Sequence, residues 1–305
     1  MVAVSRGQSK HLNKSLKISA AVRSFLGHLE GTGKSSHTVS NYQTDLRVFE
    51  RFLVQGGKSL QDVSRDDLER FHDHLKALGL KTNTRRRKLL TVRRLMRYLS
   101  QRKKIDIDVG NRLPTPAKIE RVPLTLDLTD LIRRIHTLPS DSPITLRNQT
   151  LLLTLAETGC LVSEVIRLRF EDWDMERTGS CKVTVGGTKT VRQIAVSGEL
   201  RDKLRQLQNG AGKSDSSAWC FLGFNRAGPL GSPISARGVE LLVKSLIPAL
   251  GLETAIHPKH FRHSAVLAWF KAGLTKNQIR ERLGLRTEYA FRVFEPLIKA
   301  DAESE

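Results

Sequence analysis

One short segment divides this sequence into two parts with different patterns. Residues 105–122 (IDIDVGNRLPTPAKIERV) contain Pro114 and Pro116 and show neither helical nor strand periodicity. Proline lacks a backbone N–H and disfavours a helical conformation in the residue before it, so this stretch predicts a linker. With 305 residues, the chain is long enough for two domains that each bury a core.

The part before the linker carries four helical patterns. Ser35 and Ser36 are suited to cap the second helix, and Ser64 with Asp67 forms a capping-box pattern at the third. We therefore predict a helical domain. The predicted organisation is a basic mobile tail at 1–14, a helical domain at 15–104, a linker at 105–122 and a second domain at 123–305. Within the helical domain, the helices are predicted near 15–30, 36–55, 65–80 and 83–103.

The part after the linker is mixed but mainly helical. The segments KVTVGG and RQIAVS alternate apolar and polar residues on either side of Gly186-Gly187, which predicts a β-hairpin. The predicted fold class is therefore two-domain and mainly α, with a small β-sheet. Helices are predicted at 144–159, 199–208, 234–249, 259–272, 275–283 and 287–299.

The charge of the chain points to a polyanionic partner. Lys and Arg number 51 against 31 Asp and Glu, a formal net charge of +20. Nucleic acid is the first interpretation of such an excess, and an acidic membrane surface is the second. No apolar run approaches the length of a membrane span. Three cysteines without C-x-x-C spacing, and no signal-peptide pattern, favour the reducing cytoplasm.

The fourth predicted helix concentrates this positive charge. Residues 81–104 contain eleven Lys or Arg and no acid, and the resulting repulsion is relieved by a phosphate backbone. A plain solvated surface is the alternative interpretation. The candidate DNA contacts are Arg85, Arg86, Arg87, Lys88, Arg93, Arg94 and Arg97 on this helix, and Ser36, His37, Thr38 and Asn41 on the second helix.

A second cationic cluster lies near the C-terminal end. Lys259, Arg262 and His263 stand at a predicted helix start, where free backbone N–H groups also favour anions. His257 and His260 share the i, i+3 spacing with His263, but no thiol or carboxylate joins them, so we predict no metal and no cofactor.

Four segments in order resemble the tyrosine recombinases, or phage integrase family. ETGCLVSEVIRLRFEDWD is similar to their T-G-x-R-x-x-E box, and TKTVRQIAV to the hairpin with the catalytic lysine. HPKHFRHSAVLAWFKAG is similar to the H-x-x-R-H box, and IRERLGLRTEYAFRVF to the segment from L-G-H to the tyrosine nucleophile. The resemblance implies a core-binding domain and a catalytic-like domain that close on duplex DNA as a clamp.

Three catalytic positions of the family keep a suitable side chain. The family's lysine falls on Lys189, at a hairpin tip from which it would protonate a leaving oxygen. Its histidine falls on Lys259, a change that the chemistry tolerates, and its second arginine falls on Arg262. These three residues are also candidate phosphate contacts, together with His263.

Three other catalytic positions are lost. The first arginine of the family falls on Leu161, the L-G-H histidine on Leu285 and the nucleophile on Phe294, which has no hydroxyl to form a phosphotyrosyl bond. Losing one preorganised charge of this kind costs about 3–4 kcal/mol in the transition state. Tyr289 precedes Phe294 by five residues, about 500° of helical rotation, so we expect the two rings to point apart.

The resulting hypothesis is a DNA-binding protein derived from a recombinase that has lost strand cleavage and acts in the cytoplasm at the nucleoid. Chromosome organisation, gene regulation and assistance of an active recombinase all agree with the sequence. The partners expected are double-stranded DNA, further copies of this chain on DNA, and an active recombinase. Two alternatives are an active recombinase that uses Tyr289 as a displaced nucleophile, and an interaction module whose C-terminal helix docks on a neighbour.

Overall fold

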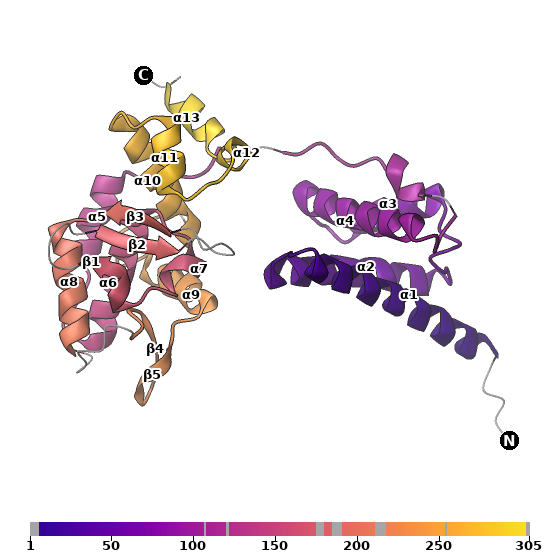
Figure 1. The fold of residues 1–305 in the computed structure, drawn as a ribbon, viewed down its shortest axis with the longest axis horizontal. Coiled ribbons are helices and arrows are strands. Elements are labelled where there is room, and N and C mark those ends of the chain that lie inside the picture. Colours follow the sequence, from indigo (N-terminus) through magenta and orange to yellow (C-terminus); the bar gives the residue numbers. More distant parts are fainter. Residues whose placement is uncertain are drawn as a thin grey trace. The chain divides into compact units, whose positions relative to one another are not determined.

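The chain folds into two compact units, residues 1–120 and 121–305, in a computed structural model (Figure 1). The structure describes residues 6–106, 108–119, 122–174, 180–184, 191–210, 218–253 and 255–302. Each unit has its own hydrophobic core. No helix within these ranges has the length and apolar character needed to cross a membrane.

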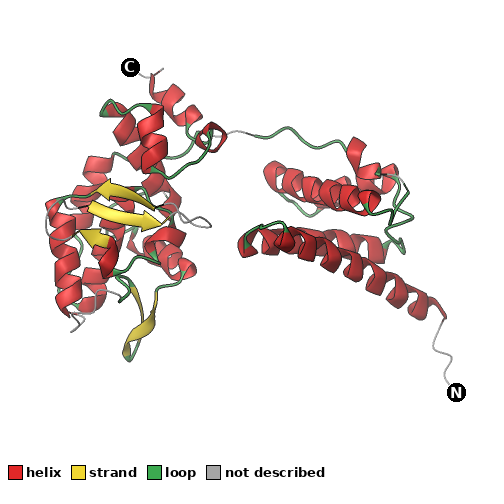
Figure 2. Ribbon diagram, in the orientation of Figure 1, coloured by secondary structure: helices red, strands yellow, loops and turns green. Residues whose placement is uncertain are grey.

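The first unit is built from helices in its described residues (Figure 2). The range 1–14, for which the sequence predicts a tail, is helical from Arg6 onward, which corrects that expectation. The helices are α1 (Arg6–Gly31), α2 (Ser36–Gln55), α3 (Arg65–Ala77), α4 (Thr82–Gln101) and the short 3₁₀ helix η1 (Val109–Arg112).

Local sequence signals explain where these helices begin. The Ser35 hydroxyl accepts a hydrogen bond from the backbone N–H of Thr38, and Ser64 and Asp67 form the predicted capping box. Although burial opposes it, hydrogen bonds from Ser64 and from the side chains of Arg70 and Lys58 lower the pKa of Asp67 to about 2. The helices then bury a continuous apolar cluster that includes the fully buried Phe49 and Phe71.

The described residues of the second unit combine helices with two small antiparallel sheets, one of three strands and one of two (Figures 1 and 2). The predicted hairpin is confirmed, because β2 pairs with β3 with Cys181 opposite Ile194, and β1 extends the sheet on the other side of β2. The elements are α5 (Leu128–His136), α6 (Pro143–Thr158), α7 (Val162–Val165), η2 (Phe170–Asp172), β1 (Trp173–Asp174), β2 (Ser180–Thr184), β3 (Val191–Ala195), α8 (Gly198–Gly210), β4 (Leu222–Asn225), β5 (Gly228–Pro233), α9 (Ala236–Leu246), α10 (Pro258–Lys271), α11 (Lys276–Arg282), α12 (Glu288–Phe291) and α13 (Glu295–Ala302).

The C-terminal helix differs from its prediction. Residues 287–299 do not form one helix but two short ones, α12 and α13, separated by residues 292–294. Pro296 has no N–H to donate to the carbonyl of residue 292, and its ring disfavours helix through the preceding turn. The break gives Tyr289 and Phe294 different surroundings.

Candidate nucleic-acid interface

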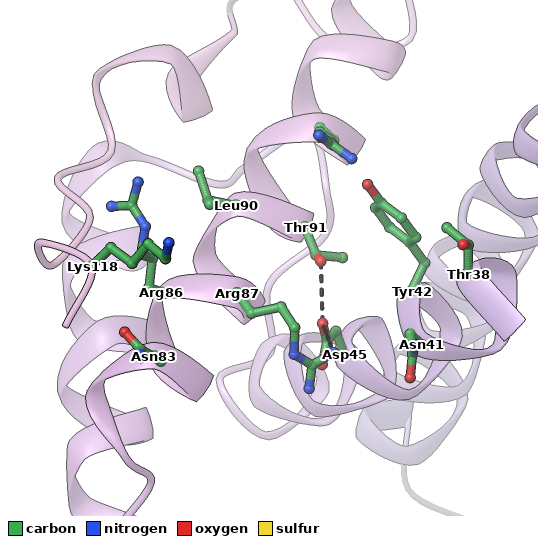
Figure 3. Close-up of a pocket in the computed structure, with 11 residues that line it drawn as sticks. Thr38, Asn41, Tyr42, Asp45, Asn83, Arg86, Arg87, Leu90, Thr91 and Lys118 are labelled. Atoms are coloured by element: carbon green, nitrogen blue, oxygen red, sulfur yellow. Dashed lines mark hydrogen bonds and ion pairs between the residues drawn. The ribbon is translucent and has the colours of Figure 1, made fainter. Parts of the chain in front are cut away.

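A cationic cavity of about 480 Å³ lies between α2 and α4 of the first unit (Figure 3). Its walls carry basic side chains together with amide and hydroxyl groups, which are the groups that contact phosphates and base edges in DNA-binding proteins. The lining residues are Thr38, Asn41, Tyr42, Asp45, Asn83, Arg86, Arg87, Leu90, Thr91, Arg94 and Lys118.

A buried carboxylate holds the two walls together. Asp45 of α2 accepts hydrogen bonds from Arg87 Nη1 at 2.6 Å, Lys88 Nζ at 2.9 Å and Thr91 Oγ1 at 3.2 Å. The Lys88 residue is only 6% exposed, so its ammonium serves this interhelical pair. The structure therefore places Lys88 in an interhelical ion pair and not on the exposed surface where a DNA contact was predicted, and α4 does not lack a compensating carboxylate, because α2 supplies one.

The remaining predicted contacts differ in exposure and in their hydrogen-bond partners. Arg94 is exposed and stacks over the ring of Tyr42 at 5.6 Å, and Arg97 is also exposed. Arg86 and Arg93 instead donate hydrogen bonds to the interdomain segment, to the carbonyls of Pro116 and Asn111. Partly exposed Arg85 donates to the hydroxyl of Thr82, whereas Ser36, His37 and Asn41 are exposed and Thr38 is half-buried at the start of α2.

The net charge is concentrated in the same unit. Residues 1–120 contain 25 Lys and Arg against 11 Asp and Glu, a net +14, whereas residues 121–305 contain 26 against 20, a net +6. The first unit therefore provides most of the field that attracts a polyanion.

Arg262 of α10 is buried in the second unit. Its Nη1 donates to the carbonyl of Gly159 at 2.7 Å and its Nη2 to the carbonyl of Leu283 at 3.2 Å. The residue is 6% exposed, and burial lowers the pKa of its guanidinium to about 10 against the opposing effect of Glu164. Arg262 thus links the ends of α6 and α11 through their carbonyls.

A second buried arginine, Arg192 of β3, pairs with Glu164. Its Nη1 and Nη2 donate to Oε1 and Oε2 of Glu164 at 2.8 and 2.9 Å. Glu164 Oε2 also accepts the backbone N–H of Leu161, whose side chain is exposed. Sequence reasoning missed this pair, although strand alternation places Arg192 on the same face as the apolar Ile194, which was a signal for a buried arginine with a partner.

Phe294 is buried between two aromatic rings. It is 3% exposed, with its ring edge-on to His263 at 5.9 Å and tilted to Phe291 at 5.6 Å. Burial, with the nearby positive charges of His260 and Lys259, lowers the pKa of His263 to about 4. His263 is half-buried and packed against Phe294, and Leu285 packs against the same cluster.

Tyr289 stands in a different environment. The residue is 77% exposed on α12, and the guanidinium of Arg292 lies 5.5 Å from its ring. Among the described residues, no hydrogen bond joins its hydroxyl to Arg262. The expectation that Tyr289 and Phe294 point to different places is confirmed.

The other predicted site residues also have defined positions. Lys259 and His257 are exposed, and the backbone N–H of His257 donates to His260 Nδ1 at 3.2 Å, which occupies that nitrogen. In the described part of the chain, no three His, Cys, Asp or Glu side chains gather to hold a metal ion. Lys189 lies outside the described residues.

Comparison with protein families identifies the chain. Residues 22–103 match the model of the phage integrase N-terminal SAM-like domain, and residues 127–287, more than half of the chain, match that of the phage integrase family. The chain belongs to the phage integrase family. The resemblance proposed from the four sequence segments is thereby confirmed.

Named members of the phage integrase family align with most of the chain. It is 27% identical over 267 residues to tyrosine recombinase XerC of Xanthomonas campestris pv. campestris (strain B100), covering 87% of this chain and 80% of that one. It is 28% identical over 265 residues to XerC of Lactobacillus delbrueckii subsp. bulgaricus (strain ATCC BAA-365 / Lb-18), covering 85% and 88%.

Solved structures of the phage integrase family share the fold. The XerH recombinase bound to palindromic difH substrate, a post-cleavage complex, gives a TM-score of 0.71 at 16% identity, covering 92% of this chain and 83% of that one. A lambda integrase dimer bound to a COC′ core site gives 0.67 at 14% identity, covering 96% and 82%. The match to the phage integrase family model ends at residue 287, before both Tyr289 and Phe294.

Proposed function

We propose that this chain binds duplex DNA through the cavity between α2 and α4 and does not cleave it. The cationic walls of the cavity and the net +14 of the first unit support binding. Relatives solved on their DNA substrates support the same partner. The first unit then provides phosphate contacts, and the amide and hydroxyl groups of Asn41 and Thr38 on α2 provide contacts to bases.

Loss of cleavage rests above all on Phe294. The family position for the nucleophile holds a ring without a hydroxyl, buried against His263, and no phosphodiester can be attacked from it. Arg262 supports the proposal because its guanidinium binds backbone carbonyls in a buried site. Leu161 supplies no charge for a pentacoordinate phosphate.

The binding test measures affinity for a duplex as a function of salt. A chain that neutralises several phosphates loses orders of magnitude in affinity between ~50 and ~200 mM salt. Fluorescence anisotropy with a labelled duplex should therefore show a steep linear dependence of log K on log salt. A flat dependence, or no binding at ~50 mM salt, contradicts DNA as the partner.

The cleavage test separates this proposal from an active recombinase that uses Tyr289. The exposed side chain of Tyr289 and the relatives named tyrosine recombinase favour the alternative. Incubation with a nicked suicide duplex, followed by a denaturing gel, should show no covalent protein–DNA adduct. An adduct that disappears in the Tyr289→Phe variant overturns the proposed loss of activity but leaves DNA binding intact.

A further inference from the structure

The interdomain segment is anchored to the cationic helix α4 by a bidentate side-chain contact. Asn83, in the first turn of α4, donates from Nδ2 to the carbonyl of Ile119 at 2.8 Å. Its Oδ1 accepts the backbone N–H of Ile119 at 3.0 Å. One amide side chain therefore binds both backbone groups of one linker residue, which fixes the position and the direction of the chain there.

A second anchor lies one turn further along α4. Arg86 Nη1 donates to the carbonyl of Pro116 at 2.6 Å and to the hydroxyl of Thr115 at 3.3 Å. Residues 115–119 contain neither helix nor strand, so no regular backbone pairing holds them. The side chains of Asn83 and Arg86 thus determine where this segment lies on the first unit.

The consequence concerns Lys118, which lies between the two anchors. Lys118 is exposed and lines the same cavity as Arg86, Arg87 and Arg94, as Figure 3 shows for the labelled residues. Lys118 thereby brings a linker cation to a cavity wall that already carries three arginines, and positive side chains gathered in this way attract a phosphate backbone.

We propose that residues 115–119 form part of the DNA-binding surface, with Lys118 contacting a phosphate and with Asn83 and Arg86 as positioning residues. This inference rests on the proposed DNA binding of the first unit. Because coupling between two sites is reciprocal, DNA bound in the cavity also stabilises the docked state of the interdomain segment.

The test uses the full chain and a duplex titrated at several salt concentrations. Lys118→Ala should lower the magnitude of the slope of log K against log salt by about one, the value for one phosphate contact. Lys118→Arg should retain the wild-type slope. Lys76→Ala removes the same charge from α3, outside the cavity, and is the matched control, with an unchanged slope.

Asn83→Ala tests positioning separately from direct contact. It should produce about the same loss of slope as Lys118→Ala, and the double variant should lose no more than either single variant. Trypsin cleavage after Lys118 should be slowed by DNA in the wild type and accelerated in Asn83→Ala without DNA. Asn83 is exposed, and urea unfolding verifies that the variant is folded.

Different outcomes overturn different statements. Wild-type binding with equal slopes for Lys118→Ala and Lys76→Ala refutes the role of Lys118. Additive losses in the double variant refute positioning, because Asn83 then contacts DNA independently of Lys118. Absence of wild-type binding refutes the proposed function itself.

Discussion

Asp45→Ala should destabilise the first unit strongly, because it leaves the buried Lys88 ammonium without its partner. Removing one member of a buried ion pair costs about 3–5 kcal/mol, since the remaining charge is uncompensated. The Arg87 side chain is 48% exposed, so its ion pair adds at most about 1 kcal/mol. A typical domain has only about 5–15 kcal/mol of stability, so the variant would lose a large fraction of it.

The position of the tryptophans allows a clean assay. Trp173, Trp219 and Trp269 all lie in the second unit, so tryptophan fluorescence reports its unfolding, whereas far-UV circular dichroism reports both units. With an m value of about 2 kcal/mol/M in urea, a loss of 3–5 kcal/mol lowers the midpoint of the first unit by roughly 1.5–2.5 M. The fluorescence midpoint should not change.

A double variant tests the reason for the loss. Asp45→Leu combined with Lys88→Met replaces the pair by apolar groups and should recover most of the stability, because apolar replacement of a buried pair is often neutral. The Thr91 hydroxyl then loses its acceptor, which costs about 1 kcal/mol. If the free energy of unfolding of Asp45→Ala lies within about 1 kcal/mol of the wild-type value, Lys88 reaches water without the carboxylate and the reasoning is refuted.

Three further predictions concern contacts in both units. Arg94→Ala should lower the salt slope of DNA binding by about one, whereas Lys88→Met should leave it unchanged; equal effects would show that Lys88 reaches DNA. The pKa of His263 is about 4 in the folded chain and 6.5 as a reference, so the unfolded chain binds more protons between these values. The contribution of His263 to the free energy of unfolding should thus be complete above pH 6.5 and fall by on the order of 1–2 kcal/mol as the pH drops to 4. Urea titrations of the His263→Gln variant should lack this part of the loss at acid pH. Glu164→Gln weakens the buried pairing with Arg192 and should lower the midpoint seen by tryptophan fluorescence; an unchanged midpoint would contradict a structural role for the pair.

Buried charges show the limit of local reasoning. Asp45 lies in the apolar stripe of its helix, between Tyr42 and Leu46, and an acid at such a position signals a buried partner. The identity of that partner is not a local property, because Lys88 follows 43 residues later. Spacing on α4 could therefore not distinguish the cation that pairs inside the unit from those that face solvent.

The sequence by itself determined the main helices of the first unit, the β2–β3 hairpin, the family and the absence of a phenol at position 294, because periodicity, capping residues and motif spacing are local properties of the chain. Only the tertiary structure decided that Lys88 and Arg262 are buried, that Asn83 binds the interdomain segment and that α12 and α13 are separate helices. Burial and hydrogen bonding depend on which distant segments meet in the folded chain. The type of a residue and the pattern around it do not identify the distant residue that its side chain contacts.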